Sequence, residues 1–246
     1  LAPEYLLSHP LPQARVVDAQ TRATQYPARI YPENAQYQLL AARVKVANSE
    51  NPQIALRNFE NAYLQSPTSN LAKYSYALSL KGVRRYDEAF VLIDELLSIS
   101  PDNLVFQSLN LELLLASNQA APALTYIQSL PASQSDNHVL RMRLAETYNR
   151  LNKFELAAKV LSEQTVKRPN DPIIWYELAE AYGLSGDIYQ LHLSRSKYFE
   201  LVGSFGQSIE HIRLAKRSLG DNPIEQAVLD QRIRRIAQIQ SQEMRL

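Results

Sequence analysis

The sequence predicts an all-α fold, built as an array of antiparallel helix pairs. The first observation is a period of 34 residues, because alanine stands at positions 55, 89, 123 and 157. The second is proline at 67, 101 and 169 in the same register, with Ser135 at the remaining place. The third is a large apolar residue four positions after each alanine, on the same helix face: Phe59, Ile93, Ile127 and Leu161. A fixed period of this length indicates repeated helix pairs, none of which can bury its apolar face alone.

A second set of residues identifies the repeat. It recurs after 34 positions, as Leu144, Ala145 and Tyr148 and then as Leu178, Ala179 and Tyr182, with Trp175 three residues before Leu178. The order Trp, Leu, small residue, Tyr, Ala, large apolar residue and Pro resembles the tetratricopeptide repeat (TPR). This resemblance covers residues 36 to about 222. It implies a TPR superhelix, an α-solenoid whose small residues let neighbouring helices approach closely and whose prolines end each second helix.

The period divides the chain into units, taken here in order. Four regular repeats are predicted at 36–69, 70–103, 104–137 and 138–171, inside an array that covers 31–222. The irregular unit 172–222 opens with "PIIWYELAEAYGLSGD". Its second helix, at about 187–202, has Leu191 and Arg195 where an alanine and a large apolar residue are expected, so we predict that it serves as the first helix of the next unit. The segment 206–215 then supplies the second helix, with Ser208, Ile212 and Ala215 in the key places.

Both ends of the chain depart from the repeat. Residues 223–246 are predicted to form an amphipathic capping helix, with an apolar set made of Ile224, Val228, Ile233, Ile236 and Ile239. At the other end, residues 1–30 precede the array. Prolines at 3, 10 and 12 predict that residues 1 to about 12 have no regular structure. A helix from about 13 to 25 is predicted to pack on the first repeat.

The composition excludes several classes of protein. The net charge is +1, which argues against nucleic-acid binding and against an anionic membrane surface, and Arg232, Arg234 and Arg235 are interpreted as a solvated helix face. The absence of cysteine excludes a disulfide scaffold, a thiol nucleophile and a Cys-ligated metal. No run of 18 apolar residues occurs, so no membrane span and no membrane contact is expected. Because the sequence begins with Leu1 and not Met, we expect it to be part of a longer precursor.

Motifs that carry catalytic chemistry are absent from the sequence. Neither H-E-x-x-H nor G-x-S-x-G occurs, and the six glycines form no phosphate-binding loop. His138, His192 and His211 are interpreted as structural, and Glu177 with Glu180 as a solvated pair that lines a groove and not as an acid–base pair. The sequence therefore predicts no catalytic residue, no cofactor and no metal ligand, and assigns this chain no enzymatic activity.

The predicted function is protein binding. In TPR arrays the first helices line a concave groove that receives a segment of a partner protein. In this register the groove is predicted to include Tyr74, Leu78, Lys81, Ser108, Glu112, Met142, Glu146, Asn149, Tyr176 and Glu180. Tyrosine is favoured at binding surfaces because it offers area and a hydrogen bond at low entropic cost. Co-chaperones that clamp a C-terminal carboxylate are excluded, because the inner positions hold Leu40, Val44, Tyr74 and Leu78 in place of Lys and Asn.

The opening stretch "PEYLLSHPLPQARVVDA" resembles a segment of the β-barrel assembly-enhancing proteases (BepA-like) of Gram-negative bacteria. In these H-E-x-x-H zinc metalloproteases, a His-Pro segment follows the catalytic core and a TPR array comes next. Ser8, His9, Pro10 and Arg15 carry the match. The resemblance implies a periplasmic parent that is a zinc endopeptidase with a chaperone role in outer-membrane protein quality control. It implies three partners: the β-barrel assembly machinery, its outer-membrane protein substrates and the parent's own protease domain. The zinc ligands, the general base and the catalytic helix are absent from this sequence.

Two other hypotheses remain open. One is a stand-alone cytosolic TPR scaffold with an unrelated protein partner. The other is an enzyme in its own right, which no motif supports.

Overall fold

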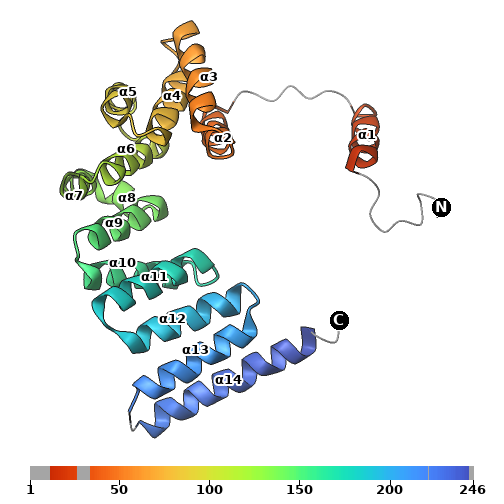
Figure 1. Cartoon of the computed structure of the whole chain (residues 1–246), viewed down its shortest axis with the longest axis vertical. Coiled ribbons are helices and arrows are strands. Elements are labelled where there is room, and N and C mark those ends of the chain that lie inside the picture. Colours follow the sequence, from red (N-terminus) through yellow and green to blue (C-terminus); the bar gives the residue numbers. More distant parts are fainter. Residues whose placement is uncertain (1–11, 27–33, 221, 244–246) are drawn as a thin grey trace. The chain divides into compact units, whose positions relative to one another are not determined.

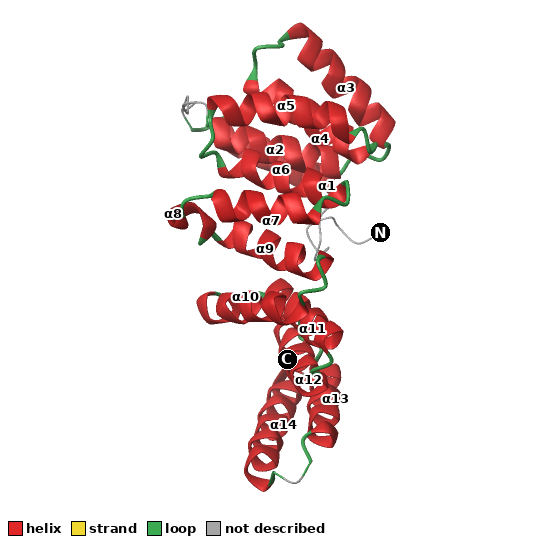
Figure 2. Ribbon diagram, turned by 90° about the vertical axis from the view of Figure 1, so that its left-hand side faces the viewer, coloured by secondary structure: helices red, strands yellow, loops and turns green. Residues whose placement is uncertain are grey.

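The computed structural model describes residues 12–26, 34–220 and 222–243. Within these ranges the chain forms fourteen helices and no strand, as Figure 2 shows, so the predicted all-α fold is confirmed. The chain divides into two compact units, residues 1–37 and 38–246. They are described separately.

The first unit contains helix α1, Pro12–Ala23. Arg22 forms an ion pair with Asp18 one turn earlier, at 2.8 Å, which supports the helix locally. Of the His-Pro motif, Ser8, His9 and Pro10 lie outside the described residues, and Arg15 is an exposed residue of α1. The predicted lack of structure before residue 12 also falls outside them, and packing of this helix on the first repeat stays a prediction.

The second unit is a series of helix pairs that follow one another in chain order (Figure 1). The pairs are α2 (Ala35–Ala47) with α3 (Pro52–Gln65), α4 (Asn70–Gly82) with α5 (Tyr86–Ile99), α6 (Leu104–Ala116) with α7 (Ala120–Ser129), α9 (His138–Arg150) with α10 (Phe154–Lys167), and α11 (Pro172–Ser185) with α12 (Ile188–Leu201). The short α8 (Ala132–Ser135) lies between the third and fourth pairs, and α13 (Phe205–Ser218) and α14 (Pro223–Glu243) complete the unit.

Each first helix from α4 to α11 begins at a polar cap, and the caps recur every 34 residues. Ser69, Asn103, Asn137 and Asp171 each accept a hydrogen bond from a backbone N–H of the first turn, at 2.9–3.3 Å. The prolines two residues before three of these caps explain where the preceding helices end, because the residue before a proline avoids helical geometry. Where Ser135 replaces the proline, α7 ends at Ser129 and α8 fills the gap.

The turn inside each pair also obeys the period. Arg84, Asn118, Asn152 and Gly186 stand 34 residues apart, and all four adopt positive φ, between 56° and 82°. Only glycine adopts this left-handed geometry without steric cost, so the first three turns depend on the packing of their helices.

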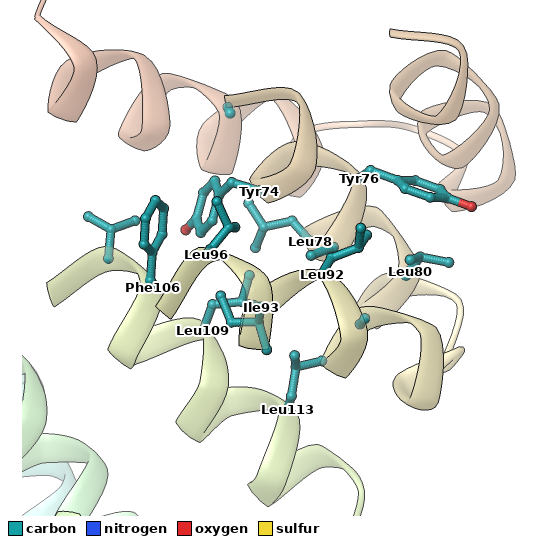
Figure 3. Packing of buried hydrophobic residues seen from close by; sticks show 14 of the residues in the cluster. Tyr74, Tyr76, Leu78, Leu80, Leu92, Ile93, Leu96, Phe106, Leu109 and Leu113 are labelled. Atoms are coloured by element: carbon teal, nitrogen blue, oxygen red, sulfur yellow. The ribbon is translucent and has the colours of Figure 1, made fainter. Parts of the chain in front are cut away.

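The core lies between successive helices and uses the periodic residues. Ala89, Ala123 and Ala157 are fully buried, as are Ile93 and Leu161 four positions after two of them. Figure 3 shows the part of the core between α4, α5 and α6, where Tyr74, Leu96 and Phe106 meet. The alanines permit the close approach of the helices and the large side chains fill the remaining space.

The irregular unit behaves as predicted in one respect and differs in another. Helix α12 packs on both α11 and α13, and Ser196 faces Ser208 with their hydroxyl groups 3.0 Å apart, both fully buried. Ser208 therefore takes the place of the periodic alanine and also forms a hydrogen bond. Arg232 is not part of a solvated face, because Arg232 and Arg235 of α14 both reach Glu200 of α12, at 3.5 and 2.8 Å.

The apolar face of α14 is not the predicted one. Leu229 and Ile236 are buried, with Ile233 and Ile239 packed beside them, whereas Ile224 and Val228 are 80% and 58% exposed. Residues 229, 233 and 236 share one face at helical spacing, and this face lies one position away from Val228. In the part of the chain that the structure describes, no helix has both the length and the hydropathy that a membrane span requires.

Candidate partner-binding groove

Four of the predicted groove residues are buried, so the prediction that they offer a binding surface is wrong. Tyr74, Leu78, Ser108 and Glu112 are between 0% and 8% exposed. The physical reason is that α4 packs directly on α6, and the inner faces of these two first helices cover one another. Tyr74 lies against Phe106, with ring centroids 5.8 Å apart, and its hydroxyl group accepts a hydrogen bond from Arg43 Nε at 3.1 Å.

A cluster of charges occupies the inner side of these helices, and we call it the Glu112 cluster. Arg43 Nη1 of α2 and Arg143 Nη2 of α9 donate to Glu112 Oε1 at 2.8 and 2.9 Å. Lys81 Nζ of α4 donates to Oε2, and the Ser108 hydroxyl group donates to Oε1 at 3.2 Å. One carboxylate on α6 thus connects the first helices of four successive pairs. Lys81, also predicted as a groove residue, belongs to this cluster.

The pKa of Glu112 shows which effect dominates in the cluster. Burial would raise the pKa, but the charges of Lys81, Arg43 and Arg143 outweigh it and hold the pKa at about 2. Glu112 is therefore ionised at every pH at which the protein would be studied, and the cluster binds these helices together.

The other five predicted residues line a real hollow, which we call the α9–α11 groove. Met142, Glu146 and Asn149 on α9 face Tyr176 and Glu180 on α11 across a space of about 750 Å³. Further lining residues are His138, Val139, Arg143 and Arg150 on α9, and Asp171, Ile173, Ile174 and Glu177 at or near the start of α11. On each helix the lining residues stand three or four positions apart, so they share a face.

The groove presents apolar side chains. Ile173 is 62% exposed, Tyr176 42% and Val139 36%. The Tyr176 ring is positioned by its neighbours, because the Arg195 guanidinium lies 4.4 Å from its centroid and the Tyr198 ring meets it edge-on at 5.4 Å. A partner that covered these side chains would remove apolar surface from water without first having to order the tyrosine.

Carboxylates dominate the polar part of the groove. Glu146 forms an ion pair with Arg143 at 2.7 Å, Glu180 pairs with Arg195, and Asp171 lies 4.0 Å from His138. Glu177 forms no ion pair with any residue that the structure describes. Burial raises the pKa of Glu177, the nearby Glu146 raises it further, and Arg143 opposes them. The sequence singled out Glu177 only as one of a solvated pair, and the structure shows that it is half-buried.

The structure brings two histidines together that the sequence treated separately. His192 of α12 and His211 of α13 face each other with their Nδ1 atoms 3.1 Å apart, and Phe199 stacks on the His211 ring. Burial lowers the pKa of both groups, and for His211 the charges of His192 and Arg195 lower it further, while Glu210 opposes them.

This pair predicts a pH dependence of stability. Below the ordinary histidine pKa of about 6.5, the unfolded chain binds more protons at these two positions than the folded chain does. The melting temperature should therefore fall between pH 7.5 and pH 5.5. The double variant His192→Gln/His211→Gln should lose part of this fall, which differential scanning fluorimetry at both pH values measures. An equal fall in the variant would contradict the assignment, and His138→Gln serves as the control.

Comparison with known proteins places these features in context. No family model matches the chain. The chain is 32% identical, over 238 residues, to the β-barrel assembly-enhancing protease of Yersinia pestis, with 94% of this chain and 48% of the relative covered. It is 28% identical to the protein of the same name from Escherichia coli, with 97% and 49% covered. The chain thus spans about half the length of the curated relatives it matches.

Solved structures show the same fold. A thermophilic TPR protein of Thermus thermophilus superposes with a TM-score of 0.57 at 18% identity, covering 73% of this chain and 97% of that one. At this identity the likeness concerns the fold alone, and it confirms the TPR solenoid that the 34-residue period predicts.

Proposed function

We propose, from the homology of this chain to the TPR part of the β-barrel assembly-enhancing proteases, that it docks protein partners for such a protein. The observation that carries the proposal is the α9–α11 groove, where a hollow of about 750 Å³ keeps apolar and carboxylate side chains accessible. TPR solenoids use concave surfaces of this kind to bind other proteins. The homology favours this interpretation over a stand-alone cytosolic scaffold.

The finer proposal concerns the parent protein. We place it in the periplasm and assign it a chaperone role in the assembly and quality control of outer-membrane proteins. The groove would dock the parent to the β-barrel assembly machinery or to the outer-membrane proteins that this machinery assembles. The names of the relatives support this, since they describe proteases that enhance β-barrel assembly. The zinc site and the peptidase activity would belong to the half of the parent that this chain does not match.

Binding to purified components tests the docking proposal. The purified chain should bind the isolated β-barrel assembly machinery, or an unfolded outer-membrane protein held in mild denaturant, in surface plasmon resonance. The double variant Met142→Ala/Tyr176→Ala should weaken this binding at least about ten-fold, because an exposed aromatic residue held in place is a typical hot spot.

The matched control is Val166→Ala, which truncates an apolar residue of α10 that is 81% exposed and lies outside the groove. Circular dichroism should show that helicity and melting temperature stay close to those of the parent sequence in both variants. Unchanged affinity of the double variant for both probes would refute docking through this groove.

A further inference from the structure

The chemistry of the groove narrows the kind of segment that it can take. This step rests on the proposed function and concerns the same site. Among the lining residues, four carry carboxylates, at 146, 171, 177 and 180, and only Arg143 and Arg150 carry guanidinium groups. Two negative charges therefore remain uncompensated when His138 is neutral. An occupant with its own positive charge would be complementary.

The two arginines do not alter this conclusion. Arg143 is committed on both sides, because Nη2 donates to Glu112 and Nη1 to Glu146. Arg150 is exposed and also lines a second hollow of about 250 Å³, together with Lys81 and Glu112, on the side away from α11. The excess of negative charge is therefore on the α11 side of the groove.

Glu177 is the group that gains most from a cation. It is half-buried, it lies near Glu146, and none of the described residues forms an ion pair with it. A carboxylate in such a place loses hydration without a compensating partner, and it is repelled by its neighbour. A lysine or arginine side chain between Glu177 and Glu146 would relieve both costs, with charge-assisted hydrogen bonds to each.

Apolar side chains lie on both sides of this position. Ile173 stands one turn before Glu177 on the same face of α11, and Tyr176 is its neighbour in the groove lining. Across the groove, Val139 and Met142 of α9 stand on the face that carries Glu146. A long cation would thus reach the carboxylates with its alkyl stem against apolar surface, and apolar residues beside it would cover Ile173 and Val139.

We propose that the α9–α11 groove takes a segment of a partner protein in which a lysine or arginine is flanked by apolar residues, with the cation held between Glu177 and Glu146. The affinity and the choice of segment then come from different groups: the apolar side chains supply most of the buried area, and the two carboxylates select the charge.

Three fluorescein-labelled peptides test this proposal. Each carries the core Leu-Tyr-X-Leu-Val between flexible Gly-Ser ends, with X as Lys, Gln or Glu. Fluorescence anisotropy against the whole purified chain should show the Lys peptide bound at least about ten-fold more tightly than the Glu peptide, with the Gln peptide between them. Lowering the pH through the raised pKa of Glu177 should weaken the Lys peptide while leaving the Gln peptide unchanged.

The variant Glu177→Gln identifies the residue responsible. It should bring the affinity for the Lys peptide to that for the Gln peptide without changing the latter. The matched control is Glu163→Gln, which removes an exposed carboxylate paired with Arg141 of α9 and outside the groove lining, and it should keep the preference for Lys.

Three results would overturn the proposal: equal affinity for the Lys and Gln peptides, an unchanged preference for Lys in Glu177→Gln, or no binding of any of the three. The double variant Met142→Ala/Tyr176→Ala separates this failure from that of the proposed function. If the machinery or the unfolded outer-membrane protein still binds through the groove, only the inference about charge fails. If neither binds, the docking function fails as well.

Discussion

Replacement of Glu112 by glutamine is expected to lower the free energy of unfolding by roughly 3–5 kcal/mol, because it leaves Arg43, Lys81 and Arg143 facing a neutral group in a largely buried site. The side chain of Glu112 is 7% exposed, and those of its three partners are about 30% exposed. Solvent reaches the cations more than the carboxylate, so the lower end of the range is the better expectation. Urea denaturation at pH 7 measures the change.

The dependence on pH gives this prediction a second measurement. The pKa of Glu112 is held at about 2, below the ordinary value of 4.5. Its ionisation therefore stabilises the folded state fully above about pH 5, and this stabilisation is lost as the pH falls towards 2. The gap between the original chain and Glu112→Gln should narrow from pH 5 to pH 3.

The control for this prediction is Glu95→Gln. Glu95 pairs with Lys73 at 2.5 Å, but its side chain is about half exposed, and such a pair contributes about 1 kcal/mol or less. A loss of stability in Glu112→Gln no larger than in this control would show that the cluster does not hold the first helices together.

The second large effect is expected from Tyr74→Ala. Tyr74 is fully buried between α4 and α6, so its removal leaves a cavity beside Phe106 and should cost roughly 3–5 kcal/mol, as for other large aromatic residues in cores. The change also removes the hydroxyl group to which Arg43 donates. Thermal and urea denaturation should both show the loss.

Tyr176→Ala is the matched comparison, because the two tyrosines occupy corresponding places on first helices of the repeat. Tyr176 is 42% exposed, so its loss should change stability much less and should affect partner binding instead. Equal destabilisation by the two changes would contradict the division of the first helices into a packed part and a groove. Tyr74→Ala and Glu112→Gln share Arg43, so their effects should not add.

The fold could be predicted from the sequence because packing repeats with the chain. A residue such as Ala89 or Ile93 contacts the same neighbours in each unit, so its burial follows from its place in the 34-residue period. The caps from Ser69 to Asp171 follow the same rule. The face of α14 could not be placed in this way, because a terminal helix has a neighbour on only one side and its pattern has no second unit to confirm it.

The candidate site could be predicted only in part. The period indicates which residues of a first helix face inwards, but not whether the next first helix covers them. Between α4 and α6 it does, and Tyr74 is core; between α9 and α11 a groove remains, and Tyr176 lines it. The role of Glu112 escaped the prediction because its partners Arg43 and Lys81 are 69 and 31 residues away, distances at which charge pairing leaves no pattern in the sequence.

The central claim is that partners dock in the α9–α11 groove, and hydrogen–deuterium exchange of the chain with and without the purified β-barrel assembly machinery tests it most directly. The claim predicts that binding slows exchange of the backbone amides of α9 and α11, and that α3 and α5 stay unchanged. Protection confined to other helices, with α9 and α11 exchanging as in the unbound chain, would contradict it.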